Sequence, residues 1–229
     1  MLNFQQTEKK VKKYLSVLGE CPLFAGIGEE DLLKMLPCLG ATVAQFDKKY
    51  TIFTEGSSAR HIGILLSGAA QVTQVDYYGN RSILTSVHTA EVFAEAFACA
   101  GVEALPVSVI ATQPSEVMLI ECSRILHTCQ NGCAFHQRLI YNLMKDLATK
   151  TILFHQRADV ISKRTTREKL MAYLMFYAKK TGTSSFEIPF DRQELADYLE
   201  VDRSGLSTEI GKLRNEGVLT CRRSRFTLL

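Results

Sequence analysis

Three residues near the middle of the chain have the types and spacing of metal or haem ligands. Cys129, Cys133 and His136 fall at i, i+4 and i+7, so they would share one face of a helix that already includes Cys129. Thiolate and imidazole groups at this spacing could hold zinc or iron. The alternative is that the helix begins after Cys129, near Asn131 and Gly132, and that these cysteines are small buried residues. Both interpretations stay open from the sequence.

Three arginines lie close together near the C-terminus: Arg222, Arg223 and Arg225. Such a cluster is typical of contacts to nucleic-acid phosphates, although an ordinary solvated turn could have the same composition. The net charge is +3 for the whole chain, −1 for residues 1–162 and +4 for residues 163–229. The positive charge is therefore concentrated at the end of the chain, which favours a polyanionic partner there.

The sequence contains no pattern of an enzyme. None of the five histidines has a neighbouring serine, aspartate or cysteine that suggests a catalytic triad, and the phosphate-binding pattern G-x-x-x-x-G-K is absent. We therefore expect a binding protein without catalytic activity and without a cofactor.

Composition predicts an ordinary globular protein in the cytoplasm. The chain has 229 residues, of which 46% are hydrophobic and 22% are charged. Its seven cysteines are odd in number, and no secretory segment follows the basic residues near the N-terminus, so we expect reduced thiols. The most apolar stretch, residues 92–111, contains Glu95, Glu103 and Pro106, which argues against a membrane span.

Residues 41–120 consist of short apolar and β-branched runs separated by turn signals such as EGSS and DYYGN. This spacing predicts an all-β sandwich or barrel. The segments EKKVKKYL and GEEDLLKMLPCL before it read as short amphipathic helices that cap the domain without entering its core.

A long helix is predicted over residues 131–162. Its apolar positions follow alternating spacings of four and three, which is the a/d seam of a coiled coil: Ile140, Met144, Leu147, Thr151, Phe154, Ala158 and Ile161. A second stripe, formed by Phe135, Leu139 and Leu143, lies on another face and is expected to pack on the β domain of the same chain. We expect the seam to form a homodimer, the alternative being a helix buried within a monomer.

The remaining residues, 163–229, predict a winged helix-turn-helix. Capping boxes at Thr165/Glu168 and Asp191/Glu194 mark the starts of two helices. A further helix follows after a tight turn, and the small Ala196 lies where the pair would approach closely. The apolar positions of this pair are Leu195, Leu199, Val201, Leu206, Ile210 and Leu213. The tail GVLTCRRSRFTLL alternates like a two-stranded wing.

At this point the sequence resembles the Crp/Fnr family of transcription regulators over nearly its whole length. The strongest segment is RQELADYL followed by VDRS and LS, and the runs TIFTEG, LLSGAAQV and FAEAF resemble the β-roll of cyclic-nucleotide-binding domains. The resemblance implies an α+β fold with a jelly-roll-like sensor domain (1–130), a dimerisation helix (131–162) and a DNA-binding domain (163–229). It also implies a homodimer on double-stranded DNA, with RNA polymerase and a small-molecule effector as partners and no membrane.

The expected effector pocket departs from that of members that bind cyclic AMP. Those members resemble F-G-E-L followed by R-S-A or R-T-A; here the glycine is Ala94, the glutamate is Glu95, and the Arg-Ser pair is Leu105-Pro106. A phosphate would lose its guanidinium, and Pro106 also lacks an N–H donor. We therefore expect no cyclic AMP binding. The degenerate pocket is assigned to Glu95, Ala96, Leu105, Pro106 and Thr151.

The recognition helix also departs from the family. Members of the Fnr branch resemble E-x-x-S-R at its start, whereas this chain has Ser204, Ser207 and Thr208. The base-reading set is therefore predicted to be Arg203, Ser204, Ser207 and Thr208, with Asp202 as N-cap. Gln193, Arg222, Arg223 and Arg225 are predicted to contact phosphates. Glu200 occupies a turn position where glycine is common.

The sequence thus predicts a homodimeric, DNA-binding transcription regulator whose effector is unknown. One alternative is a metal-, haem- or redox-responsive regulator that uses Cys129, Cys133 and His136. Another is a constitutive DNA binder with a purely structural β-roll.

Overall fold

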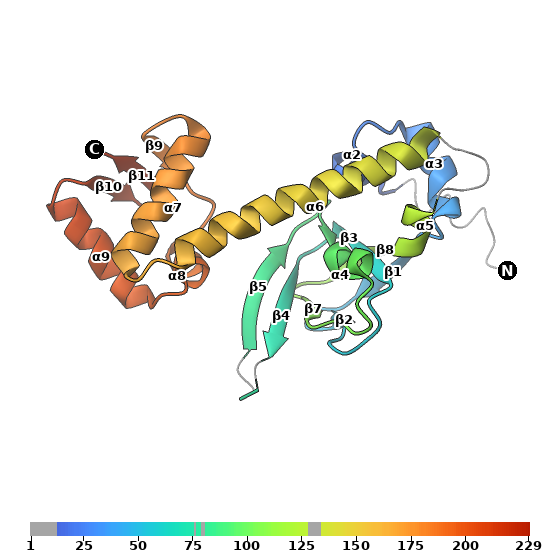
Figure 1. Ribbon diagram of the computed structural model, residues 1–229, viewed down its shortest axis with the longest axis horizontal. Coiled ribbons are helices and arrows are strands. Elements are labelled where there is room, and N and C mark those ends of the chain that lie inside the picture. Colours follow the sequence, from blue (N-terminus) through green and yellow to red (C-terminus); the bar gives the residue numbers. More distant parts are fainter. Residues whose placement is uncertain (1–12, 76, 79–80, 128–133) are drawn as a thin grey trace. The chain divides into compact units, whose positions relative to one another are not determined.

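The computed structural model describes residues 13–75, 77–78, 81–127 and 134–229 (Figure 1). The chain folds into two compact units, Met1–Thr149 and Lys150–Leu229. The boundary falls inside α6 (Ala134–Ile161), which contributes to both units. The division into three parts at residues 130 and 162 stays a prediction. Within the described ranges, no helix is both long and apolar enough to cross a bilayer.

The first unit combines short helices with two antiparallel sheets. In chain order its elements before α6 are α2 (Leu15–Glu20), the short 3-10 helix η1 (Pro22–Phe24), α3 (Glu29–Cys38), β1 (Thr42–Phe46), β2 (Thr51–Phe53), β3 (His61–Ser67), β4 (Ala70–Val75), β5 (Arg81–Val87), β6 (Val92–Phe93), α4 (Glu95–Ala100), β7 (Ser108–Ala111), β8 (Ser115–Glu121) and α5 (Cys122–Leu126). One sheet has the strand order β1-β8-β3-β6, and the other has the order β2-β7-β4-β5. The predicted β-roll is confirmed.

Alternation along the strands places apolar residues on both faces of the first sheet. On β3, Ile62 and Ile64 belong to the core beneath the helices, whereas Leu65 belongs to the core between the two sheets. Val109 of β7 and Val117 of β8 meet Leu65 in that second core. Successive side chains of a strand point to opposite faces, so β3 and β8 serve two cores at once.

The predicted segment GEEDLLKMLPCL forms α3, whereas most of the predicted segment EKKVKKYL lies outside the described residues and α2 begins at its last residue. Both α2 and α3 are part of the main core, so the expectation that the N-terminal helices only cap it was wrong. Leu18 of α2 and Leu32 of α3 are at most 2% exposed and pack in one cluster with Ile64. Leu139 and Leu143 of α6 join the same cluster, which confirms that the second stripe of the long helix packs on its own β domain.

A buried polar side chain fixes α6 to this core. Asn142 is 5% exposed, and its amide nitrogen donates to the carbonyl oxygens of Leu23 and Ala25 at 3.0 and 2.9 Å. Buried carbonyl groups need such partners, so Asn142 sets the position of α6 along the helical part of the first unit.

The second unit is a winged helix-turn-helix, in which α7, α8 and α9 pack beside a small sheet (Figure 1). Its elements after α6 are α7 (Thr166–Thr181), β9 (Ser185–Glu187), α8 (Arg192–Leu199), α9 (Arg203–Asn215), β10 (Leu219–Arg222) and β11 (Arg225–Leu228). The sheet has the order β10-β11-β9 and is antiparallel. Leu195, Leu206 and Phe226 are fully buried in its core, as the helical spacing and the alternation of the wing predicted. The described residues have the predicted α+β fold.

Candidate nucleic-acid interface

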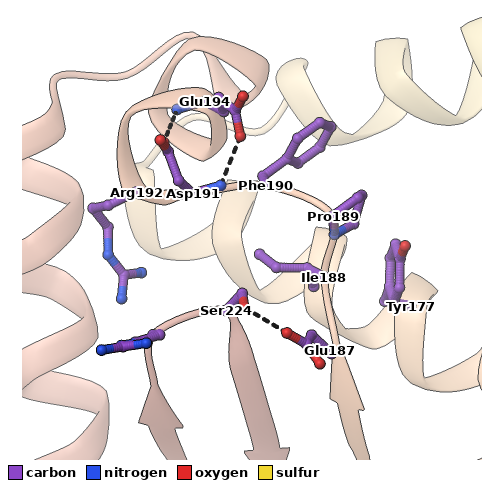
Figure 2. A pocket seen from close by; sticks show the side chains of 10 residues that line it. Tyr177, Glu187, Ile188, Pro189, Phe190, Asp191, Arg192, Glu194 and Ser224 are labelled. Carbon is purple, nitrogen blue, oxygen red and sulfur yellow. Dashed lines mark hydrogen bonds between the residues drawn. The ribbon is translucent and has the colours of Figure 1, made fainter. Parts of the chain in front are cut away.

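The first helix of the pair, α8, begins at the predicted capping box. The Asp191 side chain accepts from the backbone N–H of Glu194 at 2.8 Å, and the Glu194 carboxylate accepts from the N–H of Asp191 at 2.8 Å (Figure 2). These bonds satisfy two backbone donors that the helix itself leaves unpaired. The capping box between Thr165 and Glu168 at the start of α7 is confirmed in the same way.

The turn between α8 and α9 contains a residue in the left-handed backbone region. Glu200 has φ 52° and ψ 55° and ends α8. The ammonium group of Lys169 on α7 donates to the carbonyl oxygens of Leu199 and Glu200 at 3.1 and 3.3 Å. Arg157 of α6 lies over the Tyr198 ring and within 3.8 Å of the Glu200 carboxylate. The turn thus has the geometry that glycine usually provides, supported by a lysine and an arginine.

Replacing Glu200 by glycine is expected to stabilise the second unit. A side chain in the left-handed region costs about 1 kcal/mol, and glycine avoids this cost. Glu200→Ala is the matched control because it also removes the carboxylate near Arg157 but keeps the backbone strain. In urea unfolding of the full chain, Glu200→Gly should be more stable than Glu200→Ala by about 1 kcal/mol. Equal stabilities of the two variants would show that this turn is not strained.

The second helix, α9, exposes the predicted base-reading residues. Arg203, Ser204, Ser207 and Thr208 are all exposed. The opposite side of the helix is buried through Leu206, Ile210 and Leu213. This division leaves the N-terminal face of α9 open to a partner, as in helices that read the major groove.

The four predicted base-reading side chains of α9 differ in whether their hydrogen-bond donors are already used within the protein. Asp202 caps α9 by accepting from the N–H of Gly205 at 2.8 Å, and the Ser204 hydroxyl also donates to its carboxylate. These two bonds hold the pKa of the Asp202 carboxyl below its ordinary value, and the bond from the Ser204 hydroxyl has the larger effect. The Thr208 hydroxyl donates to the Ser204 carbonyl oxygen at 3.0 Å. Arg203 contributes the planar, charged group best suited to a base edge or a phosphate.

The wing places the predicted arginines at its tip. Arg222 and Arg225 face each other across the hairpin, and Arg223 occupies its turn with φ 54°. All three are exposed. The Ser224 hydroxyl donates to the Glu187 carboxylate at 2.9 Å, which ties the turn to β9 (Figure 2). The tip therefore presents its positive charges from a turn that is anchored to the neighbouring strand.

A hollow of about 820 Å³ separates the wing turn from the start of α8. It is lined by Tyr177, Glu187, Ile188, Pro189, Phe190, Asp191, Arg192, Glu194, Arg223 and Ser224. Arg192 crosses from α8 to the wing, where it donates to the Cys221 sulfur at 3.4 Å and lies over the Phe226 ring. Arg192 was not among the residues predicted to contact DNA, although its basic side chain next to Gln193 was the available signal. Gln193 is exposed, and its amide donates to the Asp197 carboxylate at 2.8 Å.

The residues assigned to the effector pocket fall in both units. Ala94 has φ 62°, which lies in the left-handed backbone region that favours glycine, the residue expected here from the family resemblance. Glu95 is 5% exposed at the start of α4, while Ala96 and Pro106 are exposed. Thr151 belongs to the second unit and is exposed.

Neither the side chain nor the backbone N–H of Leu105 is available to bind a phosphate. The Leu105 side chain is 3% exposed. Its N–H donates to the Ser57 carbonyl oxygen at 2.8 Å, and its carbonyl oxygen accepts from Gly56 at 2.8 Å. The donor that an anion would need at this residue is therefore already used.

Of the three predicted metal or haem ligands, Cys129 and Cys133 lie outside the described residues. His136 is 5% exposed, and its Nε2 atom lies 2.9 Å from the Arg124 carbonyl oxygen. In the part of the chain that the structure describes, no three histidine, cysteine or acidic side chains gather as a metal site. The ligand hypothesis for Cys129, Cys133 and His136 stays a prediction.

Comparison with known families assigns both parts of the chain. Residues 43–131 match the family described as Cyclic nucleotide-binding domain. Residues 168–229 match the family described as Crp-like helix-turn-helix domain. These ranges cover the two antiparallel sheets of the first unit and the helix-turn-helix with its wing. The fold and the interface thus define a β-roll protein with a Crp-like helix-turn-helix.

Individual relatives agree with this assignment. The Transcriptional activator protein FnrL of Cereibacter sphaeroides is 25% identical over 79 residues, which are 31% of this chain and about a third (32%) of that relative. The c-di-GMP responsive global regulator CLP of Xanthomonas campestris has the same fold, with a TM-score of 0.59, 16% identity and coverage of 85% of this chain and 97% of that one. The Thermus thermophilus catabolite activator protein has a TM-score of 0.52, 20% identity and coverage of 91% and 93%. The chain belongs to the Crp/Fnr family of transcriptional regulators.

Proposed function

We propose that this chain is a regulator that binds a two-fold-related DNA site as a homodimer. In this proposal α9 enters the major groove, while Gln193 and the wing arginines contact phosphates. The observation that supports it most directly is the exposed N-terminal face of α9, whose opposite face is held in the core of the second unit. The exposed arginine cluster of the wing and the net charge of +4 for residues 163–229 support it further.

The dimer is proposed to form through the a/d seam of α6. Met144 and Phe154 on this seam are 64% and 71% exposed in the single chain. Two large apolar side chains open to water on one stripe indicate a missing partner surface. Two copies of α9 would then meet half-sites about 34 Å apart, or one helical turn of DNA.

Regulation is proposed to reach the DNA-binding domain through α6. An effector in the β-roll, or a redox event, would change the packing of the paired α6 helices and thereby the spacing of the two α9 helices. FnrL is a transcriptional activator. RNA polymerase is accordingly a partner in this proposal, and catalysis has no part in it.

Selection of bound duplexes from a random pool tests the proposal. The full chain should enrich a two-fold-related sequence with half-site centres about 10 base pairs apart. The selection is run with and without cell extract to detect effector dependence. Arg203→Ala with Ser207→Ala is the control, because it alters only exposed side chains of α9 and should enrich a different half-site or none. If the unaltered chain enriches no sequence in either condition, the proposed function is wrong.

We predict no saturable binding of cyclic AMP or cyclic GMP at micromolar concentrations. Leu105 replaces the guanidinium, Pro106 has no N–H, and the N–H of Leu105 is bonded to Ser57. Calorimetric titration measures this, with adenosine as the control ligand that lacks the phosphate. Saturable heat with the cyclic nucleotides but not with adenosine would show that a phosphate site exists after all.

A further inference from the structure

Two cysteine side chains meet in the first unit although they lie far apart in the sequence. Cys99 is near the end of α4, and Cys122 is the first residue of α5. Their sulfur atoms are 3.5 Å apart, and neither thiol is in a disulfide. The two helices pack against each other. A thiol pair in contact is the starting geometry for a disulfide bond.

The remaining change in geometry is small. A disulfide has a sulfur–sulfur length of about 2.05 Å, so the two atoms must approach by about 1.5 Å. Rotation about the Cα–Cβ bonds moves each sulfur atom without requiring either helix to unfold. The two thiols differ in their exposure to solvent, since Cys122 is 3% exposed and Cys99 is half-buried.

We propose that Cys99 and Cys122 form a reversible thiol–disulfide site that is oxidised by hydroperoxides and reduced by low-molecular-weight thiols. The Cys99 thiolate attacks the peroxide oxygen, becomes a sulfenic acid and releases water or an alcohol. The Cys122 sulfur then attacks the sulfenic sulfur, loses its proton and expels water. Two thiols are thus oxidised while one peroxide is reduced by two electrons. Two molecules of an external thiol return these electrons and leave as their own disulfide.

The electrostatic surroundings assign the roles within the pair. Burial and, after it, the contact with Cys99 together raise the pKa of Cys122 to about 12. Burial also raises the pKa of Cys99; the hydrogen bond with Cys122 opposes this rise, and the Glu95 charge adds to it. Cys99 therefore ionises before Cys122 and attacks first. Because both pKa values are raised, the site should react slowly and respond to sustained oxidation.

The bond would fix one helix of the sensor unit to another. α4 begins at Glu95 of the assigned effector pocket, and α5 is the described element immediately before α6. A disulfide between them closes the loop from residue 99 to residue 122, which stabilises the folded unit mainly by restricting the unfolded chain. This inference concerns the thiols of the first unit and does not rest on DNA binding.

Peptide mass spectrometry of the full chain tests the proposal. The reduced protein is treated with tert-butyl hydroperoxide, alkylated and digested with trypsin. Residues 82–124 contain no lysine or arginine before Arg124, so both cysteines fall in one peptide. Oxidation should leave this peptide unalkylated and lighter by two hydrogen atoms. A second digestion after glutamates separates Cys99 from Cys122 unless the disulfide joins them. Dithiothreitol should restore two alkylated cysteines.

Single variants identify the pair. Cys99→Ser and Cys122→Ser should each abolish the linked fragment, whereas Cys38→Ser, which removes an exposed cysteine elsewhere, should leave it unchanged. Oxidation should also raise the midpoint of thermal unfolding by about 5 °C in the unaltered chain and not in Cys99→Ser. The proposal is wrong if both cysteines remain alkylated under conditions that oxidise Cys38. It is equally wrong if Cys99 is found bonded to a different cysteine.

Discussion

Replacing both Met144 and Phe154 by glutamate is expected to convert a dimer into monomers. These side chains lie on the α6 seam and are 64% and 71% exposed in the single chain. Burying a large apolar side chain contributes about 1.5 to 3 kcal/mol, and a two-fold interface buries four of them. The double variant should therefore lose at least about 6 kcal/mol of association free energy, which weakens the dimer more than ten-thousand-fold.

The choice of positions separates loss of the dimer from loss of the fold. Leu147 is also on the seam, but it packs partly against the core of the first unit, so a charge there would destabilise the monomer as well. Met144 and Phe154 are exposed in the single chain. Ile152→Glu with Leu153→Glu is the matched control, since these residues are 57% and 48% exposed on the same helix but lie off the seam.

Sedimentation velocity and circular dichroism measure the two properties. The seam variant should sediment as a monomer with unchanged helix content, and the control variant should remain a dimer. A control variant that dissociates while the seam variant stays dimeric would move the interface to the Ile152 face of α6. A chain that is monomeric without any substitution would contradict the proposed dimer itself.

The elements predicted best are those whose signals are local in the sequence. The capping boxes at Thr165 and Asp191 join residues only three positions apart, so the sequence itself contains both partners. Strand alternation predicted the wing, and helical spacing predicted that Leu206, Ile210 and Leu213 are buried.

The features that the sequence did not reveal depend on contacts between distant segments. A stripe of apolar residues shows that α3 has a buried face, but it does not show that Leu32 meets Ile64 of β3. The hydrogen bond from Arg192 to the Cys221 sulfur likewise becomes visible only in the tertiary fold, as does the contact between Cys99 and Cys122. The side-chain bonds of Gln193 and Thr208 also become visible only when the helix geometry is known.

Removing the Arg203 guanidinium is expected to change sequence preference on DNA. Arg203 begins α9, beside the exposed Ser207. A guanidinium that reads a guanine edge discriminates by about 1 to 3 kcal/mol, so Arg203→Ala should weaken binding to the preferred duplex by this amount. Its affinity for a scrambled duplex should change much less.

The wing is expected to behave differently because phosphates contain no base identity. Arg222 is exposed at the tip of the hairpin, facing Arg225 across the strand pair. Arg222→Ala should weaken binding to specific and scrambled duplexes alike, and it should reduce the salt slope by about one unit. Lys163→Ala is the control for simple loss of charge in this unit, since Lys163 is already paired with Asp159 at 2.8 Å.

Titrations at several salt concentrations distinguish the two roles. Each variant is measured against the selected duplex and a scrambled duplex, so that the ratio of affinities reports base reading and the salt slope reports phosphate contacts. If Arg203→Ala lowers both affinities equally and reduces the slope, Arg203 contacts a phosphate. If Arg222→Ala instead changes the ratio, the wing reads bases, and the division of labour between α9 and the wing is the reverse of the one proposed.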